Sequence, residues 1–155
     1  MNYYEIVLLV HIISAIAGFG VTFSFGVLGP LAGKLGGPQG LGLLKGIDKI
    51  EKTLVYPAIV IQLLTGVLLI FEAGWDDDFF SHQWLWISIL VFVAAASIAV
   101  FLQAPTVEKM IELGESNQAQ SPEFGKLAKT AATRGPILSV MLLVIIFLMV
   151  TKPGS

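Results

Sequence analysis

The sequence has no cysteine and very little charge. Without cysteine the chain can form no disulfide, no thiolate metal site and no cysteine nucleophile. Charged residues make up 13% of its 155 residues, whereas a soluble domain carries about 25%. The net charge of −2 excludes a typical nucleic-acid-binding protein, because such proteins are clearly basic. Nine basic and eleven acidic residues cannot cover a particle of this size in water, so the composition also excludes a soluble domain.

Long hydrophobic stretches take the place of charge. Hydrophobic residues make up 55% of the chain, and its mean hydropathy is +0.84. A hydrocarbon core of about 30 Å needs roughly 20 apolar residues in a helix. Four stretches meet this requirement, and none alternates as a strand would. We therefore predict an all-α polytopic membrane protein, one membrane domain over residues 1–155. The four predicted transmembrane helices are residues 4–28, 54–71, 84–102 and 136–150.

The basic residues predict how the chain is oriented. Eight of the nine lysines and arginines lie in the connections 30–53 and 105–135, with Lys152 as the exception. The connection 73–83 has no basic residue and carries three consecutive aspartates, residues 76–78. Because basic loops stay on the cytoplasmic side, we expect both basic connections inside and both termini outside.

The inner connections are expected to contain helices. Residues 41–52 place their leucines and isoleucines on one helical face, which predicts an amphipathic helix lying at the inner membrane interface. Ser121 followed by Pro122 and Glu123 has the pattern of a helix start. The lysines of that second helix would point toward anionic lipid head groups.

The two halves of the chain resemble each other. Pairs of residues match at an offset of 75 and, after an insertion, of 79. Both halves run from outside to inside and back, so we predict two hairpins related as parallel repeats. The matching pairs are Pro30 with Pro105, Lys34 with Lys109, Gly46 with Gly125, and Pro57 with Pro136.

Small residues predict which helices pack closely. Ser14, Gly18, Thr22 and Gly26 recur every four residues along the first span. In lipid, small residues let neighbouring backbones approach. The alanine-rich segment 94–99 of the third span offers a matching surface, so we expect the first and third spans to pack against each other.

His11 is the only ionisable residue well inside a predicted span. Intramembrane ionisable residues are costly and often functional. It lies about 10 Å below the outer boundary at 1.5 Å per residue, and Gln62 and Thr65 fall at a similar depth. These three residues predict a polar layer. Its imidazole can be neutral and hydrogen-bonded, can bind haem or a metal in a groove beside Gly18, or can relay protons or contact a substrate.

A second candidate site lies in the outer connection. His82, Asp76 and Asp78 together have the chemistry of a divalent-cation site, although an acidic turn between two spans is commonly only solvated. No phosphate loop, paired intramembrane carboxylate or nucleophile beside a base is present in the sequence. We therefore expect no catalytic residue and a protein that is not an enzyme.

The first span resembles a known group of proteins. Residues 8–20, LLVHIISAIAGFG, resemble the "LHIxxAxxxxGG" opening of a superfamily of small bacterial membrane proteins. That superfamily includes copper-resistance protein D-like proteins, HemJ-type protoporphyrinogen oxidases and a branch described as predicted integral membrane proteins, which this chain resembles most. In its haem-binding members the first-span histidine contributes to haem binding, so the resemblance implies haem b as a possible cofactor on His11.

Three functional classes follow from these patterns. The first is a non-enzymatic membrane subunit or accessory protein that assists assembly. The second is a haem-binding or redox-linked membrane protein that uses His11, and the third is a small transporter. We expect a multi-pass protein of a bacterial inner membrane whose partners are the lipid bilayer and other membrane subunits or further copies of itself.

Overall fold

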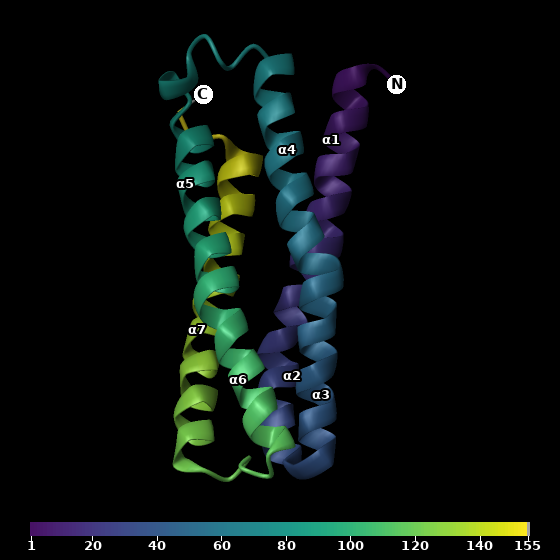
Figure 1. Cartoon of the computed structure of the whole chain (residues 1–155). Helices are drawn as coiled ribbons and strands as arrows, with labels where there is room; N and C mark the ends of the chain where they lie inside the picture. The colour runs from purple at the N-terminus through teal and green to yellow at the C-terminus, as the bar shows by residue number, and fades with distance from the viewer. Residues whose placement is uncertain (155) are drawn as a thin grey trace.

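The computed structural model describes residues 1–154 and consists of helices joined by short connections. This confirms the predicted all-α class. Within the described range, four helices are long and apolar enough to cross a membrane (Figure 1). They run over Tyr3–Leu35, Gly37–Glu72, Gln83–Glu115 and Pro122–Thr151.

Wide π-helical turns divide the first three of the four long helices. The first helix contains α1 (Tyr3–Ser14), η1 (Ala15–Gly20) and α2 (Val21–Leu35). The second contains α3 (Gly37–Ile50), η2 (Glu51–Val55) and α4 (Tyr56–Glu72). The third contains α5 (Gln83–Ser97), η4 (Ile98–Gln103) and α6 (Ala104–Glu115), and the fourth is α7 (Pro122–Thr151). The outer connection contains the short 3₁₀ turn η3 (Phe79–Ser81).

Sequence explains several of these boundaries. Asn2 and Glu5 form a reciprocal capping box that begins α1. Ser121 Oγ accepts a hydrogen bond from the Phe124 amide at 3.1 Å, so the predicted helix start at Ser121 is confirmed. The wide turns η2 and η4 end two residues before Pro57 and Pro105, which have no amide hydrogen and cannot continue the regular α-helical bonding.

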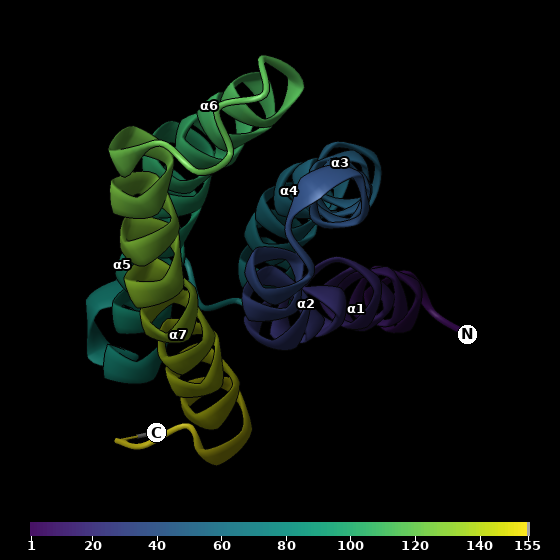
Figure 2. The ribbon, with the colours of Figure 1, turned by 90° about the horizontal axis from the view of Figure 1, so that it is seen from below.

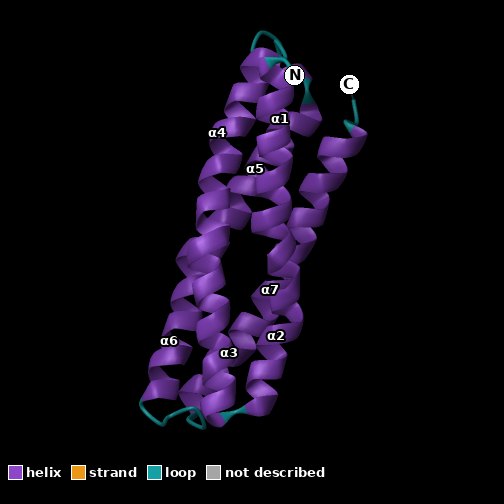
Figure 3. Cartoon of the chain, turned by 90° about the vertical axis from the view of Figure 1, so that its right-hand side faces the viewer, coloured by secondary structure: helices purple, strands orange, loops and turns teal. Residues whose placement is uncertain are grey.

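The helices form two hairpins. In the first, α1 packs on α4 and α2 packs on α3; in the second, α5 and α6 pack on α7. The hairpins contact each other mainly where α3 meets α6 and α2 meets α7. Figures 1 and 3 show both termini at the same end of the bundle. The predicted arrangement of two hairpins with the same direction is therefore confirmed, and both begin with a helix of 33 residues.

The predicted contact between the first and third spans is wrong in its main part. Gly18 lies against α4, where a methyl group in its place would overlap Cβ of Ala58. Gly18 of the first span therefore allows close packing against α4, the neighbouring helix of the same hairpin. Contact with the third span includes the rings of Phe19 and Phe92, whose centroids are 5.7 Å apart. Small residues predict close approach, but they do not identify which neighbouring helix approaches.

The predicted amphipathic helix forms, but it does not lie across the interface. Residues 41–52 belong to α3 and η2 and continue in line with α4 (Figure 1). The reason is that Leu44 is buried in a small core with Ala32 and Met110 of neighbouring helices, rather than in lipid. Side chains of α3, α6 and α7 pack around that core: Leu43, Ile111, Phe124, Leu127, Ala128 and Ala131.

The helices are longer than a membrane is thick, and the end that carries the two basic connections is rich in charged side chains. A helix of 33 residues is about 50 Å long, whereas the hydrocarbon core is about 30 Å thick. Ion pairs between helices occur at this end: Lys45 with Glu115 at 2.6 Å, Lys52 with Glu108 at 2.7 Å, and Lys109 with Glu123 at 2.7 Å. Such exposed pairs contribute little to stability, because water and salt screen them. Lys45–Glu115 and Lys52–Glu108 connect the two hairpins, whereas Lys109–Glu123 lies within the second.

Candidate functional site

The predicted polar layer of His11, Gln62 and Thr65 forms between α1 and α4. His11 Nδ1 lies 2.8 Å from Thr65 Oγ1, and His11 Nε2 lies 2.7 Å from Gln62 Nε2. A fourth residue joins them, because Ser14 Oγ donates to Gln62 Oε1 at 2.6 Å. Hydropathy and depth placed the first three residues together, and Ser14 was expected only as a packing residue.

The hydrogen bonds assign the protonation of His11. The Gln62 amide nitrogen can only donate, so His11 Nε2 accepts and carries no proton. Nδ1 is then protonated and donates to Thr65 Oγ1, which in turn donates to the Ile61 carbonyl at 2.6 Å. The imidazole is therefore neutral in this arrangement, and both of its nitrogens are occupied.

The surroundings of His11 do not fit a haem. The lone pair that would bind iron is the Nε2 lone pair, and Gln62 occupies it. The expected groove beside Gly18 is filled by Ala58 of α4. His11 and Gln62 face a cavity of about 130 Å³, below the roughly 300–1,000 Å³ of small-molecule sites. This arrangement therefore offers iron neither a free imidazole nitrogen nor space for the porphyrin.

The second predicted site lies at the outer end. His82 Nδ1 is 3.0 Å from the backbone oxygen of Asp78. Residues 1–154 bring together no group of three histidine, aspartate or glutamate side chains that could hold a metal ion, so His82, Asp76 and Asp78 are not gathered into a site. Metal binding at these residues stays a prediction.

Aromatic rings surround a lysine beside His82. The Trp75 and Trp84 rings are 5.1 Å apart, and the Lys152 Nζ lies 5.0 and 5.2 Å from their centroids. Trp84 is 1% exposed. This contact joins the end of α7 to the outer connection, and cation–π contacts of this kind contribute about 0.5–1 kcal/mol at exposed sites.

Sequence analysis missed a buried carboxylate. Glu51 in η2 is 7% exposed, and no described residue forms a hydrogen bond or ion pair with it. The signal was present, since Glu51 follows Leu44 by seven residues and Ile47 by four, and therefore shares their buried face. Gln103 in η4 was also missed, and its Oε1 is buried without a partner. Both side chains line a cavity of about 540 Å³ between the hairpins.

Comparison with known proteins identifies the family and no individual relative. Residues 5–153 match the model of the family described as "Predicted integral membrane protein (DUF2269)". Neither the curated proteins nor the solved structures compared with the chain include a match. The family description agrees with the four apolar helices and the multi-pass architecture. Because the match covers nearly the whole chain, the protein belongs to the DUF2269 family of predicted integral membrane proteins.

Proposed function

We propose that the protein is a non-enzymatic membrane subunit or accessory protein, oriented with both termini outside a bacterial inner membrane. The observation that carries this proposal is the occupied state of both His11 nitrogens. His11 is the only ionisable residue well inside a predicted span, and its bonds fasten α1 to α4. A side chain used in this way supports a structural role rather than iron binding or proton transfer.

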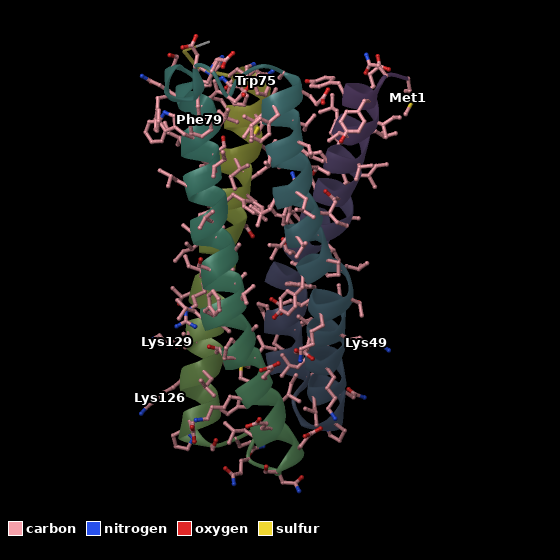
Figure 4. The ribbon with its side chains drawn as sticks, turned by 45° about the horizontal axis from the view of Figure 1, so that its top comes forward. Met1, Lys49, Trp75, Phe79, Lys126 and Lys129 are labelled. Atoms are coloured by element: carbon pink, nitrogen blue, oxygen red, sulfur yellow. The ribbon has the colours of Figure 1, made fainter. Side chains whose placement is uncertain are left out.

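The inner end supports a role in contacting other molecules. Lys49, Lys126 and Lys129 have exposed side chains on α3 and α7, and Figure 4 shows all three pointing away from the bundle. Their positive charges suit anionic lipid head groups or an acidic surface of a membrane partner. The helices carry these lysines beyond the hydrocarbon core, where a partner can reach them.

Two alternatives from the sequence stay predictions. Haem binding would require His11 to release Gln62 and the hairpin to open beside Gly18. A small transporter would require a pathway with coordinating groups through the bundle. The resemblance to copper-resistance protein D-like and HemJ-type proteins belongs to the first of these alternatives.

An absorption spectrum tests the proposal. We expect the purified full-length protein to show no Soret band, and to acquire none above that of an unrelated four-span protein when haem is added. His11→Gln should leave the spectrum unchanged. A Soret band that His11→Gln removes would overturn the proposal in favour of the haem-binding alternative.

Orientation has its own test. Lys129→Cys, in a chain that has no other cysteine, should react with a membrane-impermeant maleimide only after the membrane is opened. Asp77→Cys, in the connection at the opposite end of the bundle, provides the control and should react in intact spheroplasts. Labelling of Lys129→Cys in intact spheroplasts would overturn the proposed orientation.

A further inference from the structure

A cavity of about 540 Å³ separates the two hairpins in the inner part of the bundle. Figure 2 shows the hairpins as two distinct pairs of helices, and the residues that line the cavity come from both of them. Its volume lies within the range of small-molecule sites. The walls are almost entirely apolar, and Gly26, Gly29 and Gly33 of α2 form one of them. No atom outside their own helix lies within 4 Å of a side chain built at these glycines, so the space beside them is open.

Two side chains that line the cavity, Glu51 and Gln103, carry acceptor oxygens without a partner among the described residues. Glu51 is buried and has no hydrogen bond or ion pair with any described residue. Gln103 Oε1 is buried without a partner, while its amide nitrogen reaches the Ala131 carbonyl at 3.5 Å. A buried carboxylate is costly unless a cation or hydrogen-bond donor meets it. The group of an occupant that meets Glu51 and Gln103 is therefore expected to carry donors rather than acceptors.

No basic side chain of the cavity neutralises Glu51. Lys52 is adjacent in sequence, but its ammonium bonds the carboxylates of Asp48 at 3.0 Å and Glu108 at 2.7 Å. Lys129 is the basic residue in the lining, and its exposed side chain points away from the bundle (Figure 4). The Glu51 carboxyl therefore faces the cavity without a basic partner, and a cationic group on an occupant would stabilise its ionised form.

The depth of these acceptors indicates the kind of molecule. Glu51 lies three residues before the predicted span 54–71, and Gln103 lies one residue after the span 84–102. Both positions correspond to the inner head-group level. From there the cavity extends toward Phe19, Phe92 and Leu142, which are all apolar and lie within the spans. The cavity also extends the other way, toward Met110 and Phe124, so the two acceptors lie partway along its length. A head group at their level and an acyl chain in the apolar part within the spans match an amphiphile whose tail points toward the membrane centre.

We propose that the cavity binds a phospholipid of the inner leaflet with an ethanolamine head group, placing its ammonium against Glu51 and one acyl chain in the apolar part. The primary ammonium supplies three N–H donors, enough for Glu51 with a donor left for Gln103. A choline head group has the same charge but no donor, so it leaves both acceptors unsatisfied. This site is separate from the His11 layer and goes beyond the accessory role proposed above.

Lipid binding to the full-length protein tests the proposal. Native mass spectrometry, after removal of co-purified lipid, would compare matched lipids that carry ethanolamine, N,N-dimethylethanolamine or choline on the same acyl chains. We expect ethanolamine to bind about tenfold more tightly than choline, with the dimethyl head group between them, because charge-assisted hydrogen bonds discriminate on this scale. Equal binding of the three lipids would overturn the proposal. Tighter binding of hexadecylamine than of the ethanolamine lipid would overturn the assignment to a phospholipid.

Variants separate the head-group contact from the tail contact. Glu51→Gln keeps the shape and removes the charge, so the preference for ethanolamine over choline should fall to about twofold or less. Gly29→Leu fills the open space beside α2 and should abolish retention of all three lipids. Gly20→Leu is the matched control, because it also has open space but does not line the cavity, and it should bind as the natural protein does. An ethanolamine preference that survives Glu51→Gln, or lipid retention that survives Gly29→Leu, would overturn the proposal.

Discussion

Replacing His11 with leucine removes the side-chain bonds that His11 makes from α1 to α4. The Gln62 amide nitrogen then loses its acceptor at 2.7 Å, and Thr65 Oγ1 loses its donor at 2.8 Å. Thr65 keeps its bond to the Ile61 carbonyl, and Gln62 Oε1 keeps Ser14. The main loss is therefore the hydrogen bond of the Gln62 amide nitrogen, which is left without an acceptor. We expect the free energy of unfolding to decrease by about 1–3 kcal/mol.

His11→Gln provides the contrasting variant. Glutamine can still accept a hydrogen bond from Gln62, so we expect a loss below about 1 kcal/mol. Equilibrium unfolding in mixed micelles with increasing SDS would measure both variants. Ile12→Leu is the control, because Ile12 is exposed toward lipid on the next position of the same helix.

A double-mutant cycle with Gln62→Leu isolates the bond itself. Pairwise coupling energies of interhelical hydrogen bonds in membranes average about 0.6 kcal/mol and reach about 1.7 kcal/mol, so a coupling within this range is expected. The reasoning would be refuted if leucine and glutamine at position 11 had equal and negligible effects, or if His11 and Gln62 showed no coupling.

Other substitutions have clear expected outcomes. Gly18→Leu overlaps Ala58 and should destabilise the hairpin by about 1–3 kcal/mol in the same unfolding assay, whereas Gly20→Leu, which has open space, should be near neutral; equal effects would contradict the packing. Arg134→Ala removes the bonds to the carbonyl and hydroxyl of the third long helix at 2.7 and 3.0 Å, and should lower stability by about 1 kcal/mol in thermal unfolding; no change would count against that contact. Lys152→Ala removes the ammonium from the two outer tryptophans and should alter their fluorescence emission while costing about 0.5–1 kcal/mol; an unchanged spectrum would argue against the cluster.

Hydropathy and depth predicted much of the fold because a bilayer constrains both. The requirement for about 20 apolar residues located four helices, and the two basic connections joined them in pairs as hairpins. Counting at 1.5 Å per residue placed His11, Gln62 and Thr65 at one level, and the structure brings them together. Residue counts fix depth in a membrane helix far more firmly than rotation about its axis.

The sequence did not predict which helices pack against each other or which way each helix face points. The ridge around Gly18 predicted close packing correctly, but the alanines of the third span offered a partner as plausible as Ala58. The apolar face of residues 41–52 was equally suited to lipid and to neighbouring helices, and only the core with Ala32 and Met110 decides between them. Glu51 received no role from the sequence, although its spacing from Leu44 places it on the buried face.

The measurement that tests the role of His11 most directly is the ¹⁵N NMR spectrum of its imidazole. The chain has two histidines, so His82→Gln leaves a single labelled ring in the full-length protein. The structural account predicts a neutral ring with a protonated Nδ1 and an unprotonated Nε2 that accepts from Gln62. It also predicts no change when haem is added. A ring protonated on both nitrogens, a proton on Nε2 in place of Nδ1, or a signal displaced by added haem would contradict it.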